Sequence, residues 1–371
     1  MRRCLAAATA ALLLLAAACT DSEPDDEPAP PSEDEEEDAE DRPLPGLRVG
    51  VVLPPRDTGS ADEVEAGGLG IDELTAAFED DVAELRTVVP DSAAFVPDVA
   101  GLLVAEGYDL VCVLGRDAGD VVEALAQRHA ATSFCGAPAE PVAEPLDNLL
   151  LVDVALAELG HVLGAAMGQL GGDDPVALLA SGDRAAGQAF RSGVRAGVGA
   201  TPLREARGDL EELGAEIEAA LDDEVMAIMV DAGPDAADLI AGIEGVALLA
   251  PSPLLTAQDE GALRWRVRWE VVVEAVLVHL LDPEVELPAV LGTAEGVFAV
   301  DHGPQAGSDL VATVEQVMGE LERGERDPLE PVADDEDDED DEDDDEEDEA
   351  TPDEPDPDDG AEDDVPVASP S

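Results

Sequence analysis

The turn Gly115-Arg116-Asp117 is one of three segments whose residue types and position could bind a small molecule. It follows an apolar run at 109–114 and leads into a predicted helix at 117–129. A turn between a strand and a helix presents unpaired backbone N–H groups to a ligand. Gly115 and Asp117 are therefore candidate ligand-binding residues, although Asp117 could instead serve only as the cap of the helix.

Two further segments also follow predicted strands. The loop from Pro54 to Gly70 carries Asp57 and Asp62 after the first strand, and it belongs either at a ligand cleft or among solvated acidic loops. Gly233 follows the predicted strand at 225–230 and could face the same cleft. The candidate ligand-binding residues are thus Asp57, Asp62, Gly115, Asp117 and Gly233.

Residues for catalysis or metal binding form no recognised pattern in the sequence. The four histidines, His129, His161, His279 and His302, show no pair at the spacing of a metal site. The sequence also lacks the Gly-x-Ser-x-Gly turn of a nucleophile elbow. We therefore predict a binding protein rather than an enzyme, with no metal ion and no cofactor.

The charge of the chain argues against several classes of protein. Its 371 residues include 91 Asp and Glu but only 18 basic residues, all of them Arg, and the net charge is −73. A phosphate-binding P-loop, a Schiff-base enzyme and a protein kinase each need a lysine at the reacting group. We expect no nucleic acid as a partner, because neutralising its phosphates requires clustered cations.

The two flanks of the chain are especially acidic. Residues 20–46 contain 13 acids and one Arg, and residues 333–371 contain 24 acids and no basic residue. With so few apolar side chains to bury, both flanks are expected to be disordered. The sixteen consecutive carboxylates at 334–349 could bind Ca²⁺ or polycations weakly, or could form only a solvated, self-repelling tail.

The N-terminus has the features of an export signal. Arg2 and Arg3 precede an apolar stretch at 5–15, which is too short to span a membrane. Small residues then lead to Cys19, an arrangement that resembles a bacterial lipobox, in which this cysteine is diacylated. The alternative is an ordinary secretory signal cleaved after Ala18. Either signal predicts a protein outside the cytoplasm, and a lipid on Cys19 would anchor it to the extracytoplasmic face of the cell membrane.

Cys112 and Cys135 both lie in short apolar runs that are predicted to be buried strands. An oxidising location permits a disulfide between them. Because neighbouring parallel strands rarely offer the right Cβ geometry, we expect two buried free thiols instead.

Apolar runs of strand length alternate with amphipathic stretches through residues 47–332. The predicted strands are 47–53, 84–89, 109–114, 131–135, 148–153, 175–180, 225–230, 246–250 and 290–300. The predicted helices are 71–81, 94–106, 117–129, 154–170, 183–198, 209–221, 234–243, 268–281 and 307–322. This alternation indicates an α/β fold with parallel sheets covered on both faces. The length favours two Rossmann-like, doubly wound lobes with a ligand site beyond the carboxyl ends of the strands.

The segment 264–269 contains both tryptophans and three arginines. Its arginines could contact an anionic ligand, an acidic partner or the chain's own tails. We favour a structural role, in which the tryptophans are buried in the core and the arginines pair with surplus carboxylates.

Several strings in this order resemble one family. After the lipobox and spacer come LRVGVVL, the run Gly107 to Val111 before Gly115, Glu158 and Gly164 in ELGHVLG, and Phe190, Gly193, Ala196 and Gly197 in AFRSGVRAG. They are similar to the basic membrane protein (BMP, PnrA-like) substrate-binding lipoproteins of ABC transporters, which have a periplasmic-binding-protein type I fold. The resemblance covers most of residues 47–322.

The resemblance implies two lobes joined by hinge crossovers, a small ligand clamped between them and an ABC permease as partner. The characterised ligands of that family are chiefly purine nucleosides. This sequence departs from the family pattern in the loop after the first strand, where ADEVEAGG replaces the usual Ser-Phe-Asn, and at 135–136 and 251–252, which lack the usual Asp. We expect a nucleoside-like or another small polar ligand.

These expectations divide the chain into a signal peptide at 1–19, an acidic linker at 20–46, a two-lobed binding domain at 47–332 and an acidic tail at 333–371. The first lobe takes about 47–152 with part of 252–330, and the second about 153–251. The expected function is that of a lipid-anchored solute-binding protein of an ABC importer. The alternative is a binding-protein scaffold without a transport role, acting as a sensor partner or a surface interaction lipoprotein.

The charge of the central segment predicts dependence on salt. Residues 47–332 contain 54 acids and 15 Arg, a net charge of −39, and such self-repulsion destabilises a compact fold in dilute buffer. At about 1 M salt the Debye length falls to about 3 Å, and the repulsion is largely screened. We therefore expect the Tm of the full-length chain, followed by circular dichroism, to rise between low and molar NaCl. A Tm that does not rise would contradict a high-salt working environment.

Overall fold

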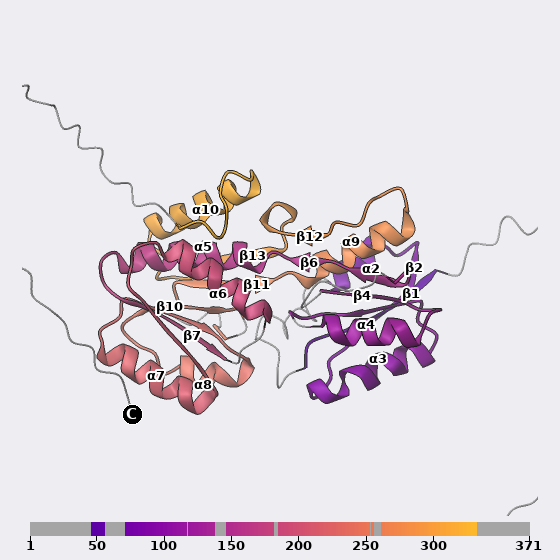
Figure 1. Ribbon diagram of the computed structural model, residues 1–371, viewed down its shortest axis with the longest axis horizontal. Coiled ribbons are helices and arrows are strands. Elements are labelled where there is room, and N and C mark those ends of the chain that lie inside the picture. Colours follow the sequence, from indigo (N-terminus) through magenta and orange to yellow (C-terminus); the bar gives the residue numbers. More distant parts are fainter. Residues whose placement is uncertain are drawn as a thin grey trace, which may run out of the picture. The chain divides into compact units, whose positions relative to one another are not determined.

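The computed structural model describes residues 46–55, 71–116, 118–137, 146–181, 185–252, 254–255 and 261–331. The predicted acidic flanks, the export signal and Cys19 lie outside these residues. The described part has an α/β architecture with two large sheets, each covered by helices on both faces (Figure 1).

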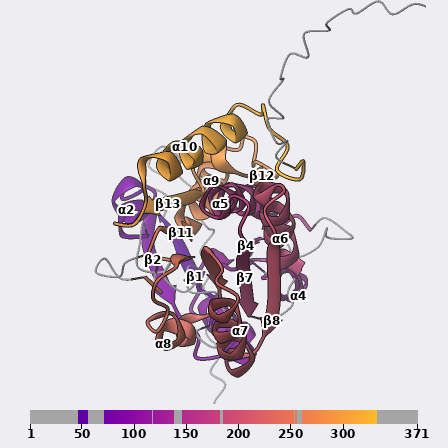
Figure 2. The ribbon, with the colours of Figure 1, turned by 90° about the vertical axis from the view of Figure 1, so that its left-hand side faces the viewer.

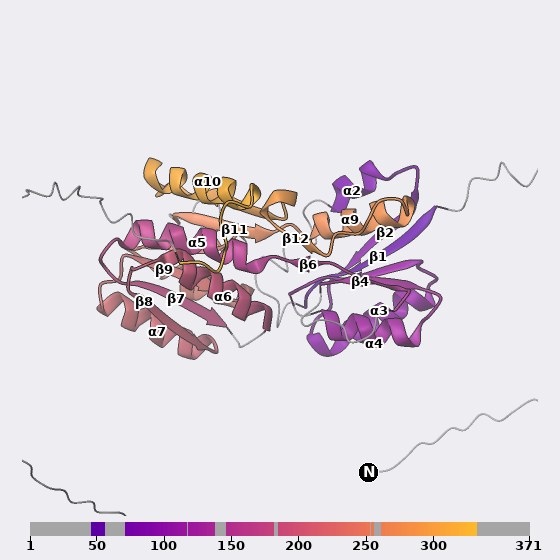
Figure 3. The ribbon, with the colours of Figure 1, turned by 45° about the horizontal axis from the view of Figure 1, so that its top comes forward.

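The first sheet is built from five parallel strands in the order β2-β1-β3-β4-β5. Their bounds are β1 Leu47–Val52, β2 Val82–Val88, β3 Leu110–Val113, β4 Ser133–Gly136 and β5 Leu149–Leu151. Helices α3 (Val96–Ala105) and α4 (Gly119–Arg128) pack on one face. Helices α2 (Ile71–Ala77) and α9 (Trp269–Leu281) cover the other, although α9 comes from a distant part of the chain (Figure 3).

The second sheet has six strands in the order β13-β11-β10-β9-β7-β8, of which only the edge strand β13 is antiparallel to its neighbour. Their bounds are β7 Val176–Ser181, β8 Leu203–Gly208, β9 Ala227–Asp231, β10 Ala247–Pro251, β11 Leu263–Val267 and β13 Phe298–His302. Helices α7 (Leu210–Asp222) and α8 (Ala237–Ile240) enclose one apolar cluster with this sheet. Helices α5 (Leu156–Gly171), α6 (Ala185–Val198) and α10 (Ser308–Glu322) lie on its other side, and α10 packs on α5 (Figure 2).

Two short strands form a separate parallel ribbon, β6 (Asp153–Val154) with β12 (Val290–Leu291). Just after β12, the backbone N–H and the hydroxyl of Thr293 both donate to Oε2 of Glu158 on α5, at 2.7 Å each. This carboxylate therefore fixes the chain leaving β12 to the first turn of α5.

Helices α5 and α6 are in contact through their backbones. A Cβ atom at Gly193 would overlap the carbonyl oxygen of Ala157, and one at Gly197 would overlap that of His161. From the other side, a Cβ at Gly160 or Gly164 would meet carbonyl oxygens of α6. The glycines in the strings ELGHVLG and AFRSGVRAG thus allow the close approach of two helices.

The observed elements confirm most of the predicted ones, with three corrections in the second sheet. Strand β11 was not predicted, because Arg264 and Arg266 alternate with its buried residues and leave no continuous apolar run. Strand β8 was not predicted, because its residues Arg204, Glu205 and Arg207 make an edge strand without a continuous apolar run. The predicted strand 290–300 is wrong as a single element. It is divided between β12 and β13 by a 3₁₀ turn that ends at Gly296, which has a φ of 70°.

The expectation of free thiols at Cys112 and Cys135 is also wrong, because the two residues form a disulfide. They are register partners on the neighbouring strands β3 and β4, and their Cα atoms are 4.3 Å apart. Partners in a parallel pair point to the same face, and here that face is the interior of the first sheet's core.

The structural interpretation of the segment 264–269 is confirmed in its main points. Trp265 on β11 and Trp269 at the start of α9 are fully buried. Arg266 and Arg268 both pair with the buried carboxylate of Glu270. Within the residues that the structure describes, no helix combines the length and the apolar character needed to cross a membrane.

The contact between α5 and α6 generates a prediction. Gly193→Ala should lower the free energy of unfolding by about 3 kcal/mol or more, because the added methyl group must push two helix backbones apart. Gly101→Ala on α3 is the matched control: nothing lies within 4 Å of its added Cβ, so it should stabilise the helix by about 1 kcal/mol. Denaturant unfolding in molar salt measures both. Equal stability of the two variants would show that the contact is not as close as described.

Candidate functional site

The strands β3 and β9 are adjacent to the topological switch points of their sheets. In the first sheet the strand order reverses between β1 and β3, and in the second it reverses between β7 and β9. Ligands of open parallel sheets bind beyond the carboxyl ends of the strands at such points. Arg116 follows β3 by three residues and Asp231 is the last residue of β9, so both lie where a ligand is expected.

Arg116 and Asp231 form a buried ion pair between the two lobes. Nη1 of Arg116 donates to Oδ2 of Asp231 at 3.1 Å and to Oδ1 at 3.3 Å. The side chains are only 4% and 9% exposed. Among the ion pairs formed between two described residues, the other pairs each have at least one side chain more than 15% exposed. The charges at this site are therefore largely removed from water.

An aromatic pair on the second lobe lies against the guanidinium of Arg116. The Cζ atom of Arg116 lies 5.6 Å from the centroid of the Phe190 ring on α6, within the range of a cation–π contact. The ring of Phe190 in turn stacks on Trp265 of β11, with centroids 6.1 Å apart. Arg116 thus reaches from the first lobe to a carboxylate and an aromatic face of the second.

The predicted candidates Gly115 and Gly233 both border this ion pair. Gly115 has a φ of 129°, a conformation that side chains disfavour, and it turns the chain between β3 and Arg116. Gly233 lies two residues after Asp231 in an extended conformation and is the N-cap of a 3₁₀ turn at Pro234–Ala236. Both glycines thus lie within two residues of the ion pair in the sequence, and their part in ligand binding stays a prediction.

The other predicted site residues, Asp57, Asp62 and Asp117, lie outside the described residues. Helix α4 begins at Gly119 with Ala118 as its N-cap, and no side chain caps it there. Asp231 was not predicted as a site residue. The available signal was a carboxylate at the end of the otherwise apolar strand AIMVD, but its partner lies 115 positions away in the sequence.

The pair offers binding chemistry rather than catalytic chemistry. A guanidinium donates hydrogen bonds and a carboxylate accepts them, so together they complement a neutral ligand with hydroxyl or amide groups. Within the described ranges, no group of three or more His, Cys, Asp or Glu side chains could hold a metal ion.

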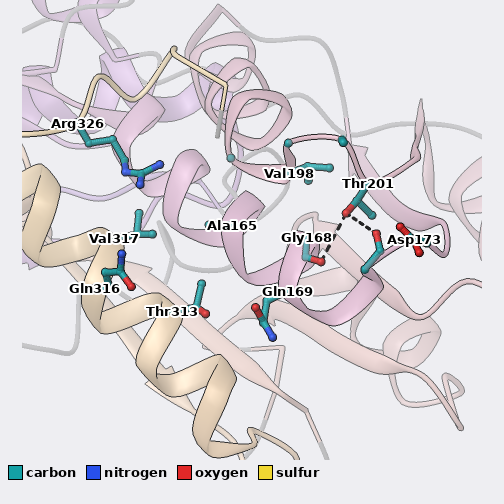
Figure 4. Close-up of a pocket in the computed structure, with 14 residues that line it drawn as sticks. Ala165, Gly168, Gln169, Asp173, Val198, Thr201, Thr313, Gln316, Val317 and Arg326 are labelled. Atoms are coloured by element: carbon teal, nitrogen blue, oxygen red, sulfur yellow. Dashed lines mark hydrogen bonds between the residues drawn. The ribbon is translucent and has the colours of Figure 1, made fainter. Parts of the chain in front are cut away.

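A separate hollow of about 750 Å³ lies between α10 and the C-terminal ends of α5 and α6 (Figure 4). Thr201 donates to the carbonyl oxygen of Gly172 at 2.8 Å, and Gln316 donates to Glu320 at 2.8 Å. Asp173 and Thr201 precede the strands β7 and β8, so the hollow is at the amino ends of these strands. Because ligands of parallel sheets bind at the opposite, carboxyl ends of the strands, we do not place the ligand there.

His161 on α5 has a structural role near the same hollow. It is fully buried, and its Nδ1 lies 3.0 Å from the carbonyl oxygen of Pro328, which assigns the ring proton to Nδ1. Nε2 can then accept from Nη1 of Arg326 at 3.4 Å. Burial lowers the pKa of His161, and the positive charge of Arg326 acts in the same direction.

The lowered pKa of His161 predicts a stability change with pH. Below about pH 6.5 the unfolded chain protonates this histidine while the folded chain resists protonation, so stability is lost as the pH falls through that value. His161→Asn can keep the bond to Pro328 but cannot titrate, so it should lose less stability than wild type between about pH 7 and pH 5. Denaturant unfolding at both pH values tests this. An identical loss in both proteins would contradict the assignment.

Comparison with known proteins found similar proteins only among solved structures. No protein-family model matches the sequence, and no curated protein is significantly similar to it. An ABC transporter solute-binding protein from Conexibacter woesei is 17% identical, with a TM-score of 0.58 over 76% of this chain and 98% of that one. A transcriptional activator of the comK gene from Bacillus halodurans is 10% identical, with a TM-score of 0.59 over 76% of this chain and 100% of that one.

A third similar structure contains a ligand. It is an ABC transporter solute-binding protein from Agrobacterium vitis bound to α-D-tagatopyranose, 14% identical with a TM-score of 0.52 over 72% of this chain and 98% of that one. At these identities the likeness shows the fold. The described part of this chain has two Rossmann-like lobes in the periplasmic-binding-protein type I fold, the fold of solute-binding proteins of ABC transporters.

Proposed function

We propose that this protein is a solute-binding protein of an ABC importer, which binds a small polar ligand between its two lobes. The observation that carries the proposal is the meeting of Arg116 and Asp231, because it places polar groups from both lobes at the carboxyl ends of strands at the switch points. The similar solute-binding proteins from Conexibacter woesei and Agrobacterium vitis support the same role.

The proposed ligand is an uncharged polar molecule rather than an anion. The Arg116–Asp231 pair carries no net charge, and the surrounding domain is strongly negative, so an anion would be repelled during approach. Nucleosides and sugars both satisfy this requirement, since both carry several hydroxyl groups. Membership of the basic membrane protein group, which would favour nucleosides, stays a prediction.

We further propose that the protein acts at the extracytoplasmic face of the cell membrane, anchored by a lipid on Cys19. The lipobox-like residues before Cys19 support this location, and the acidic segment 20–46 would then separate the membrane from the binding domain. An ABC permease is the partner that this role requires.

A thermal-shift panel on the full-length chain in molar salt tests the binding function. The panel contains nucleosides, free bases, sugars and amino acids, each compared with Asp231→Asn as the site variant. A ligand at 100 times its dissociation constant should add about 2.7 kcal/mol of stability to the wild type and clearly less to the variant.

The chemical class of the compound that stabilises the protein decides between a transport role and the scaffold without one. A nucleoside or sugar that stabilises only the wild type supports transport of that class. A hit that stabilises Asp231→Asn equally would move the site away from the ion pair. If no compound of the panel raises the Tm of the folded protein, the result would favour the scaffold without a transport role.

A further inference from the structure

We propose that Arg116 and Asp231 form a latch that holds the two lobes together before any ligand is bound. This inference rests on the proposed function, because it concerns regulation of the same cleft. Solute-binding proteins act by opening and closing of two lobes, so a contact that joins them sets how often the cleft is open.

The latch has two parts, both supplied by the second lobe to a single side chain of the first. The carboxylate of Asp231 accepts two hydrogen bonds from Nη1 of Arg116. The ring of Phe190 lies under the same guanidinium, and Trp265 stacks on Phe190 from the core side. Phe190 and Trp265 are fully buried members of one large apolar cluster, and this packing fixes the aromatic face that receives Arg116.

Burial makes this contact suited to high salt. The exposed pair Arg48–Glu84 has side chains 35% and 44% exposed, and at about 1 M salt such a pair is screened within about 3 Å. Arg116 and Asp231 are screened far less, because salt ions do not reach a pair with side chains 4% and 9% exposed. The latch therefore keeps its strength under the conditions that the acidic composition requires.

The latch is also reversible. Opening the lobes returns both charges to water, which offsets much of the attraction lost, so the pair favours the closed state only moderately. When the lobes separate, both groups regain water. Closed and open states then differ by a small free energy, and a ligand with modest preference for the closed state can shift the balance.

Small-angle X-ray scattering of the full-length chain in molar salt, without ligand, tests the latch. We compare wild type with Arg116→Gln, Asp231→Asn and the exchanged double variant Arg116→Asp/Asp231→Arg. Glu205→Gln is the matched control, because it breaks an exposed pair with Arg195 inside the second lobe. The flanks are the same in every protein, so differences in radius of gyration report the lobes.

Both single variants should have a larger radius of gyration than wild type, the exchanged variant should return toward the wild-type radius, and the control should not change it. Single variants with the wild-type radius would overturn the latch. Hydrogen exchange adds a readout that separates opening from unfolding: faster exchange confined to peptides around 110–116 and 227–233 supports the latch, whereas a uniform increase over both lobes overturns it.

The result separates this inference from the proposed function, because no ligand is used. A radius of gyration that depends on the Arg116–Asp231 pair supports the latch even when no compound of the ligand panel binds. A ligand hit together with a radius that is independent of the pair keeps the function and removes the latch.

Discussion

Residues 47–332 contain 54 carboxylates and only 15 arginines, so carboxylates outnumber arginines more than three to one. The exposed arginines of the structure bind carboxylates of their own lobe, as in Arg86–Glu106 and Arg204–Glu216. Such exposed pairs contribute little stability. The fold therefore depends on apolar burial, and its largest cluster of buried side chains includes residues of both sheets and of α9. Against this background a fully buried arginine between the lobes is a costly placement, and its position at the strand ends indicates a function.

The motifs behind the family resemblance turn out to describe packing more than ligand contact. Gly164, Gly193 and Gly197 allow α5 and α6 to touch through their backbones, and Glu158 holds the chain that leaves β12. These residues stabilise the packing of the second lobe and of the chain after β12, independently of the ligand. A scaffold of this kind can change its ligand while its recognisable strings persist, which fits a chain whose loops depart from the family pattern.

Much of the fold could be predicted from the sequence because most buried strands are continuous apolar runs followed by a helix, as in VALLA before α6. Strand β8 escaped this rule because an edge strand pairs on one side only and tolerates charges. The site was harder to predict from the sequence. Gly115 and Gly233 were predicted from their place after strands, but Asp231 needed its partner Arg116, and the disulfide needed the register of β3 and β4. Contacts between distant segments depend on how strands align, which local patterns do not specify.

The bond between Cys112 and Cys135 joins β3 and β4 at one register position just before the Gly115 turn. A covalent tie at that point prevents the two strands from sliding or separating, so the base from which Arg116 projects moves as one piece with the sheet. Displacement of the lobes is then left to the segments that connect them, where the ribbon of β6 and β12 has only two paired residues on each side. In the lobe motion proposed above, the disulfide therefore keeps the Arg116 turn and the first sheet together as one unit.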